Sequence, residues 1–380
     1  MRKIIIMSTD VYTDLSIEEK ENFDRLVNAS IESGNKIIFT SRDLSKQDSL
    51  GEISIDNKNI YFKIRDDVKS LIKKLEGKEN YFIVIGNREQ DLFMAANNKL
   101  FFIVPKWCTN YDDRVERYGI KVKSIKSLGK LIDIIINQQS WYYRLDLDDK
   151  TTILSLTNAN TKYGTHSVEE LELIEGFRSY LKEGNKKYSK ILLLHFLASI
   201  SNNPEFRDIN DWGIMPSSGT QLNEDMILFK EKARELMNGR RKEPILIRHT
   251  ETWKSHKSWK NGRDRLPCDR HFETITINTY YKKGNKLKGR TVCLFDDYLT
   301  NGTTFETARN LLLKAGVKKI FFVSLGRFGS YYHRQDYEIT GDVFSNKYTY
   351  RKIGTRLEYG HINKMAISEI ETLYDIIYNN

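Results

Sequence analysis

The stretch from residue 291 to residue 325 constrains the fold most, because it has the pattern of a strand, a loop, a helix and a second strand. Residues 292–295 form a short, continuous run of apolar or β-prone residues, which is typical of a strand that is buried on both faces. Apolar residues then recur at helical spacing up to Gly316, a typical helix C-cap, and residues 320–325 have the pattern of a second buried strand. The stretch therefore predicts a βαβ unit.

Two carboxylates and a small polar loop lie between the predicted strand and its helix. Asp296 and Asp297 directly follow the strand, and residues 300–304 read Thr-Asn-Gly-Thr-Thr. A glycine-containing loop that runs into a helix N-terminus presents several backbone N–H groups to one point, which suits a phosphate. Gly302 allows a close approach because it has no Cβ. Adjacent carboxylates suit sugar hydroxyls or a cation, so a ligand with a phosphate and a diol would use the whole stretch.

The sequence DDYLTNGTT resembles the phosphoribosyl pyrophosphate (PRPP) motif of type I phosphoribosyltransferases. The resemblance implies that Asp296 and Asp297 are catalytic residues that hold the ribose hydroxyls and Mg²⁺. It also implies that the 5′-phosphate is bound by the loop residues Thr300, Asn301, Gly302, Thr303 and Thr304. Asn301 stands where the family usually has Thr, and Tyr298 where it often has a small aliphatic residue. An ordinary strand, turn and helix is the alternative, but the strict order of strand, double acid, Thr-x-Gly-x-Thr loop and helix favours the PRPP motif.

A second loop precedes this motif in the order that the family uses. Residues 211–215 predict a short strand, and a helix is expected from about residue 223 to residue 237. The segment between them resembles the pyrophosphate loop of the ComF-like branch, and residues 173–200 resemble that branch's helical lead-in. The resemblance implies pyrophosphate contacts from Pro216, Ser217, Ser218, Gly219 and Thr220. A plain turn before a helix is the alternative.

Residues 240–290, between the two loops, are strongly basic and carry interleaved tryptophans. Phosphoribosyltransferases often place cations on a flap between these loops, where negative charge builds on the departing pyrophosphate. The resemblance therefore makes Arg248, Arg263 and Arg265 candidate catalytic residues, with Lys257 beside them. Basic residues interleaved with aromatic ones also suit single-stranded nucleic acid, so a nucleic-acid surface competes with the flap. A solvated surface is the third interpretation for each single residue.

The first 110 residues or so alternate strand-like and helix-like segments, which predicts a parallel, doubly wound sheet. Their order resembles the haloacid dehalogenase (HAD) superfamily. That family has a D-x-D motif after its first strand, a Thr or Ser after the next strand, and a later G-D-x-x-x-D motif. The resemblance implies a pocket lined by the residues at these motif positions, which are Ser8, Asp10, Thr40, Asn87 and Asp91.

Two of these positions depart from the HAD pattern. Ser8 stands where the family's phosphatases have the nucleophilic aspartate, and a serine cannot form the aspartyl phosphate or bind Mg²⁺ strongly. Asn87 replaces an acid that helps to hold the metal. We therefore expect a degenerate domain, a phosphate-binding or scaffolding module with little phosphatase activity. An alignment that makes Asp10 the nucleophile looks no more competent, because its partner position is Tyr12. A plain α/β domain without HAD ancestry is the other alternative.

The chain has a formal net charge of +10, which favours phosphate-rich partners such as PRPP, a nucleotide or nucleic acid. No run of residues approaches the roughly 18 apolar ones of a membrane span. His195 lies among leucines in a predicted helix, where a core histidine is expected. The three cysteines lie far apart and the N-terminus has no signal-peptide pattern, so we expect a cytoplasmic protein with free thiols and Cys293 in the core.

The sequence predicts an α/β protein with two doubly wound, parallel-sheet (Rossmann-like) domains. A HAD-like domain is expected at residues 1–139, a phosphoribosyltransferase-like domain at 140–345 and a C-terminal tail with a helix at 346–380. Residues 146–164 read as a polar loop with one strand at 152–156. An oligomer or a complex with another protein is compatible with the sequence.

The expected function is transfer of ribose 5-phosphate from PRPP to an unidentified acceptor, with Mg²⁺ and with release of pyrophosphate. The alternative is a non-catalytic sensor of PRPP or a nucleotide, or a nucleic-acid-associated effector in a bacterial defence or stress system. The second part of that alternative rests on analogy alone.

Overall fold

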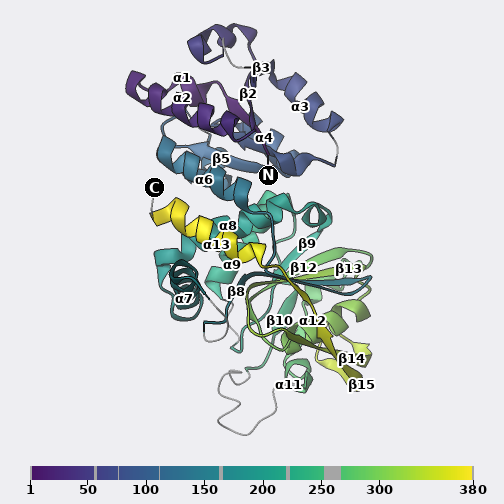
Figure 1. Cartoon of the computed structure of the whole chain (residues 1–380). Coiled ribbons are helices and arrows are strands. Elements are labelled where there is room, and N and C mark those ends of the chain that lie inside the picture. Colours follow the sequence, from purple (N-terminus) through teal and green to yellow (C-terminus); the bar gives the residue numbers. More distant parts are fainter. Residues whose placement is uncertain are drawn as a thin grey trace.

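The computed structural model describes residues 2–54, 58–75, 77–110, 112–161, 166–219, 223–251 and 267–378. Figure 1 shows an N-terminal α/β part in purple and blue, a second α/β part in teal and green, and two small antiparallel sheets at the far end of the second part. The α/β class predicted from the sequence is confirmed, because each part is built around its own six-stranded sheet.

The N-terminal part contains sheet A, in which all six strands are parallel. Its spatial order is β3 (Ile60–Ile64), β2 (Lys36–Ser41), β1 (Ile4–Ser8), β4 (Phe82–Ile85), β5 (Phe101–Pro105) and β6 (Ile120–Val122). The helices are α1 (Asp10–Thr13), α2 (Ile17–Glu32), α3 (Arg65–Lys74), α4 (Glu89–Asn97), α5 (Asp113–Tyr118) and α6 (Ile125–Asn137). The strand order reverses between β1 and β4, which creates a crevice at their carboxyl ends.

Helices cover both faces of sheet A because successive strand side chains point to opposite faces and both sets are apolar. Ile5 and Met7 pack with Phe23 of α2 and Leu131 of α6, whereas Ile6 belongs to a separate core. That second core takes its helical residues from α3, α4 and α5. This packing explains the doubly wound arrangement.

The second part contains sheet B, whose four central strands are parallel and whose edge is antiparallel. Its order is β16 (His361–Ile362), β7 (Tyr143–Asp148), β8 (Thr151–Asn158), β13 (Lys319–Arg327), β12 (Thr291–Leu299) and β9 (Asp211–Ile214). The helices are α7 (Val168–Glu183), α8 (Ser189–Asn202), α9 (Glu224–Leu236), α12 (Thr303–Lys314) and α13 (Met365–Tyr378). Helices α7, α8, α9 and α13 share a core with one face of the sheet, and α12 shares another core with the opposite face.

The helix ends in this part follow the sequence signals closely. The side chains of Ser167 and Asn223 accept hydrogen bonds from the first backbone N–H groups of α7 and α9, which caps both helices. Gly316 has a left-handed backbone just after α12 and allows the chain to turn there. One interpretation was wrong, since residues 143–158 form the hairpin of β7 and β8 rather than a loop with a single strand.

Two small antiparallel sheets and a short helix pack together beyond the carboxyl edge of sheet B, and we call them the hood. Their elements are β10 (Leu246–Arg248), α11 (Asp269–Phe272), β11 (Ile275–Ile277), β14 (Tyr331–Asp342) and β15 (Lys347–Tyr359). The 3-10 turns of the chain are η1 (Leu44–Ser54), η2 (Glu79–Tyr81), η3 (Lys186–Tyr188), η4 (Pro204–Asp208) and η6 (Thr279–Tyr281). The predicted boundary at residues 345–346 falls in the turn between β14 and β15.

The C-terminal helix α13 lies where the two parts meet, beside α6 and α7 (Figure 1). Its residues Ile370, Leu373 and Ile376 are buried in a core that also includes Leu131 of α6. The predicted boundary near residue 139 falls between α6 and β7. One continuous apolar core therefore joins the two sheets, so the two parts do not pack independently.

His195 and Cys293, which the sequence places in the core, are buried as expected. His195 lies within α8, and burial lowers its pKa to about 3, as for a core histidine. Cys293 is fully buried in β12, and Cys108 and Cys268 are also buried free thiols. Over the residues that the structure describes, we find no helix with the length and apolar character that crossing a membrane requires.

Candidate functional site

The carboxyl ends of β9 and β12 lie side by side and carry both predicted PRPP-binding loops. The two strands are parallel neighbours with Ile214 paired to Phe295. The N–H of Met215 donates a hydrogen bond of 2.7 Å to the carbonyl of Phe295. The sheet therefore places the loop that starts at residue 216 beside the acids at 296–297, at the edge where parallel sheets bind ligands.

The two acids lie within β12, which continues to Leu299 because β13 pairs with it that far. Asp296 accepts a hydrogen bond of 2.9 Å from the N–H of Asp297. Burial, reinforced by the charge of Asp297, raises the pKa of Asp296 well above its usual range. Asp297 forms an ion pair with Lys182 of α7, whose ammonium also lies 4.9 Å from the ring centre of Tyr298.

The carbonyl groups at the start of the predicted phosphate loop accept hydrogen bonds from Arg327, Phe328 and His333. The carbonyl of Leu299 accepts from the N–H of Phe328 at 2.9 Å and from Arg327 at 3.1 Å. The carbonyl of Thr300 also accepts from Arg327, and that of Asn301 accepts from the N–H of His333 at 3.0 Å. Each peptide unit is planar and trans, so its N–H points away from its C=O. The N–H groups of residues 300–302 therefore point away from this support.

Gly302 is the N-cap of α12 and has a left-handed backbone, with φ of +87°. A Cβ at this position would lie 2.2 Å from the ring of the buried residue Tyr332. No side chain caps the helix here, and Thr303 and Thr304 form its first turn. A helix N-terminus without a side-chain cap is a suitable place for a phosphate, and the role of these residues as a phosphate loop stays a prediction.

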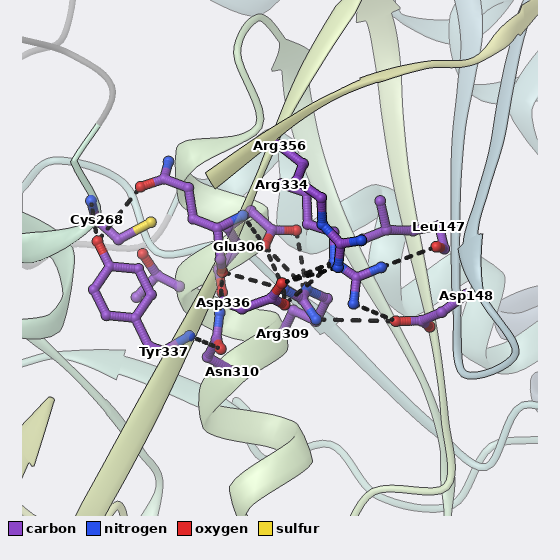
Figure 2. Close-up of polar contacts among 12 residues, drawn as sticks. Leu147, Asp148, Cys268, Glu306, Arg309, Asn310, Arg334, Asp336, Tyr337 and Arg356 are labelled. Carbon is purple, nitrogen blue, oxygen red and sulfur yellow. Dashed lines mark hydrogen bonds and ion pairs between the residues drawn. The ribbon is translucent and has the colours of Figure 1, made fainter. Parts of the chain in front are cut away.

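A buried polar network fixes α12 to the hood (Figure 2). Glu306, in the first turn of α12, accepts from Arg309 at 2.6 Å, from the hydroxyl of Tyr332 at 2.7 Å and from the N–H of Gln335 at 2.8 Å. Arg309 also pairs with Asp336 at 2.7 Å. Burial raises the pKa of Glu306, while Arg309 opposes that change. The network holds Tyr332 against Gly302 and so fixes the start of the helix.

The predicted pyrophosphate loop is joined to the hood by Arg248, at the end of β10. Its Nε donates a hydrogen bond of 2.5 Å to the carbonyl of Ser217, its Nη1 donates to the hydroxyl of Thr274, and its Nη2 lies 3.3 Å from Nδ1 of His271. Burial and the charge of Arg270 lower the pKa of Arg248 to about 10, and the carboxylate of Asp296 opposes this shift. Of the three candidate catalytic arginines, Arg248 thus lies at the site.

Four other candidates in this region lie outside the described residues. Thr220 of the second loop lies outside the described residues, as do Lys257, Arg263 and Arg265 of the basic segment. Ser217 and Ser218 lie on the described part of the loop beside Gly219 and are partly buried, and Pro216 is buried.

The structure brings together most of the predicted HAD-like pocket at the crevice of sheet A. Ser8 and Thr40 are paired neighbours on β1 and β2, and both are buried. The N–H of Thr9 donates to the carbonyl of Thr40 at 3.1 Å. Asn87 follows β4, and its Nδ2 lies 3.4 Å from Oδ2 of Asp10.

Arginine side chains contact both carboxylates of this pocket. The guanidinium of Arg88 donates two hydrogen bonds to Oδ2 of Asp10, at 3.0 and 2.8 Å. Asp91 is buried on α4 and pairs with Arg65 at 2.7 Å, and burial raises its pKa. Both carboxylates that could bind a metal ion in this pocket, Asp10 and Asp91, are therefore already paired with an arginine of the same chain.

The acid pair of sheet B has the donor chemistry that Mg²⁺ takes. Among the described residues, no group of three or more His, Cys, Asp or Glu side chains is placed to hold a metal ion. Mg²⁺ is commonly held by one or two carboxylates together with substrate phosphates. Asp296 and Asp297 are two carboxylates at one place, although Lys182 now pairs with Asp297.

Sequence reasoning missed the side chains that reach the site from elsewhere in the chain. Lys182 belongs to a helix more than 100 residues before the acid that it contacts, and no local pattern marks it. Arg327 and Tyr332 are both fully buried and support the predicted phosphate loop, a role that the sequence did not indicate.

Comparisons with known proteins add little to this geometry. No protein-family model matches the chain, and no curated protein matches its sequence. Among solved structures, the chain has a weak likeness to the UMP synthase of Leishmania donovani, with 12% sequence identity, 85% of each chain covered and a TM-score of 0.20. A likeness of this strength carries no argument about fold or function. What the chain shows by itself is an α/β architecture with two Rossmann-like sheets.

Proposed function

We propose that the second α/β part binds PRPP together with Mg²⁺ and transfers its ribose 5-phosphate to an acceptor. Asp296 and Asp297 would hold the ribose hydroxyls and the metal, residues 300–304 the 5′-phosphate and residues 216–220 the pyrophosphate. The observation that carries the proposal is the pairing of β9 with β12, which puts the two loops and the acid pair at one edge of the sheet.

The reaction would substitute the group on C1′ of the ribose. The bond from C1′ to oxygen breaks with its electron pair leaving on pyrophosphate, a bond forms from C1′ to the acceptor, and the acceptor loses a proton. Arg248 would stabilise the charge that develops on pyrophosphate, and its hydrogen bond to the carbonyl of Ser217 in the predicted pyrophosphate loop supports this role. Mg²⁺, when bound, would neutralise further charge on the pyrophosphate.

Pyrophosphate release is the direct test. The protein is incubated with PRPP, Mg²⁺ and a panel of bases, nucleotides and oligonucleotides. We expect release with at least one acceptor, and loss of release in the variant Asp296→Asn/Asp297→Asn. The matched control is Asp149→Asn, which changes an exposed acid on the β7–β8 turn. Absence of PRPP binding by the unmodified protein would refute the proposal.

Sensing of PRPP without transfer is the second candidate function, and the ion pair between Lys182 and Asp297 favours it. A ribose that binds Asp297 would displace Lys182, so binding of the ligand would change a contact of α7. The same assay separates the two functions. PRPP binding without pyrophosphate release from any acceptor would support the sensor.

A nucleic-acid surface in residues 240–290 is a further proposal. It has fewer exposed basic side chains than the sequence suggested, because some of them are buried. Arg248 and Arg270 are buried, whereas Arg240 and Lys242 are exposed. A gel shift with RNA or DNA that weakens as salt rises would support the surface. Reversal of the charges of Lys254, Lys257 and Arg263 should then abolish the shift.

We infer that the N-terminal part is a degenerate HAD-like module. Ser8 at the nucleophile position and the Arg88 guanidinium on Asp10 support this inference. Incubation with p-nitrophenyl phosphate and Mg²⁺ should give no turnover above a blank. Clear Mg²⁺-dependent turnover would overturn it.

A further inference from the structure

A partly open cavity of about 450 Å³ lies at the junction of the two α/β parts, away from both candidate pockets. Its N-terminal wall comes from α4, β5, α5 and β6, and its C-terminal wall comes from α8, α9 and the turn after α9. Small-molecule sites have volumes of roughly 300–1,000 Å³ and occur preferentially where domains meet. The cavity therefore has the size and the place of a ligand site.

The interior of the cavity is apolar and partly aromatic. Leu92, Phe102, Leu197 and Leu236 line it from both parts of the chain. Phe93 also lines it and is 42% exposed, although large apolar side chains are usually buried. An apolar ring or chain placed in the cavity would cover this side chain.

The walls are fixed by polar contacts between the two parts. Lys232 of α9 donates to the carbonyl of Arg117 at 3.5 Å. Arg207 donates to the carbonyls of Asn98 and Lys99, at 2.5 and 3.2 Å. These contacts position the walls before any ligand arrives, so little free energy is needed to open the site.

The polar residues that line the cavity are mainly cationic. Lys232 pairs with Glu235, and Arg234 pairs with Glu231. Arg114 is 64% exposed and makes one long contact of 3.6 Å, with Glu89. Within the described part of the chain, Arg240 is exposed and has no hydrogen bond or ion pair. Two arginines are thus available for a negative group.

We propose that this cavity binds a small aromatic anion. The ring lies among Phe93, Phe102 and Leu236, and the negative group lies at Arg114 and Arg240. Arginine suits this role because its planar guanidinium binds carboxylates, sulfonates and phosphates through two parallel hydrogen bonds. This site is separate from the candidate PRPP site and does not depend on it.

The test uses two fluorescent probes of nearly the same shape, the anion 1-anilinonaphthalene-8-sulfonate and the uncharged N-phenyl-1-naphthylamine. We expect the anion to bind the full chain saturably, with one site and with no displacement by excess PRPP. The variant Arg114→Glu/Arg240→Glu should weaken binding of the anion about tenfold or more, which corresponds to roughly 1.4 kcal/mol. It should leave binding of the uncharged probe unchanged. The control Lys283→Glu/Lys288→Glu changes the net charge equally at exposed positions in the hood region.

A second variant tests whether the aromatic ring of the ligand lies in the cavity. Ala96 lines the cavity and is partly exposed, so Ala96→Trp fills the space from an accessible position. Both probes should lose their binding while the far-UV circular dichroism of the protein stays unchanged. The proposal would be overturned if the anion showed no saturable site. It would also be overturned if the arginine variant weakened binding of both probes equally, or if the control variant weakened binding of the anion as much as the arginine variant does. If Ala96→Trp does not fold, the arginine variant still decides.

Discussion

The guanidinium of Arg248 donates a hydrogen bond of 2.5 Å to the carbonyl of Ser217. This contact links the hood to the loop after β9. Arg248 is only 5% exposed, and the charge of Asp296 favours its protonated form. A cation is therefore held beside the acid pair before any ligand is bound.

The first prediction concerns pyrophosphate affinity. Arg248→Met removes the cation, and the dissociation constant for pyrophosphate with Mg²⁺ should rise about tenfold or more, since a hydrogen bond to a charged group is worth roughly 1.5–3 kcal/mol. Arg248→Lys should recover part of the loss because it keeps the charge. Isothermal titration calorimetry measures both values. Arg351→Met, at an exposed position in the hood, is the control and should bind as the unmodified protein does.

The second prediction concerns Gly302. Gly302→Ala places a methyl group against the ring of Tyr332 and forces a left-handed backbone on alanine. We expect a loss of stability of roughly 1–3 kcal/mol and loss of PRPP binding. Gly284→Ala has a similar φ of +75° with no atom within 4 Å of the new Cβ. Equal loss of PRPP binding in the two variants would show that backbone strain alone, and not the packing at Gly302, explains the effect.

The third prediction concerns Lys182. Its ion pair with Asp297 competes with a ribose for that carboxylate, so Lys182→Met should tighten PRPP binding. Because Lys182 is 48% exposed and exposed pairs are weak, the gain should be at most about fivefold. A titration that compares this variant with Lys190→Met, at another exposed position close by on α8, measures the effect. Weaker binding in Lys182→Met would instead make Lys182 a contact of the ligand.

The fourth prediction concerns the pH dependence of stability. The pKa of Asp296 is higher in the folded protein than in the unfolded chain, so the folded state holds the proton more tightly. This acid therefore costs no stability below the ordinary aspartate pKa of about 3.9, and it costs stability as the pH rises through its folded value. Asp296→Asn, which resembles the protonated acid, should raise the Tm at pH 7.5. Each 1 kcal/mol corresponds to roughly 2–4 °C in a domain of 150–250 residues.

Thermal unfolding at several pH values checks this prediction. The gain in Tm should shrink toward zero as the pH approaches 4. A gain that is the same at pH 4 and at pH 7.5 would mean that protonation of Asp296 is not its cause. Asp149→Asn should change the Tm little at either pH.

Much of the fold followed from local patterns in the sequence. The helix from Asn223 and the βαβ unit around α12 were predicted within a few residues, because caps, glycines and apolar spacing mark them. The hairpin of β7 and β8 was missed although β7 alternates apolar residues with charged ones such as Asp146, the pattern of a half-buried strand, because the polar composition of the stretch was interpreted as a loop. The same reason hid β14 and β15.

The site was predictable only where its residues lie close together in the chain. Asp296 and the loop after it form one motif, so their proximity was fixed by sequence alone. The contact of Arg248 with Ser217 joins residues 31 positions apart, and that of Lys182 with Asp297 joins residues 115 apart. Such contacts depend on how the strands are ordered in sheet B, which no local pattern specifies.

A crystal structure of the protein with PRPP and Mg²⁺ tests the central claim most directly. The account predicts the 5′-phosphate within hydrogen-bond distance of the N–H groups of residues 301–304. It also predicts the ribose hydroxyls at Asp296 and Asp297 and the pyrophosphate at residues 216–219. If this loop holds no ligand at saturating PRPP, or if PRPP binds elsewhere on the protein, the account is contradicted.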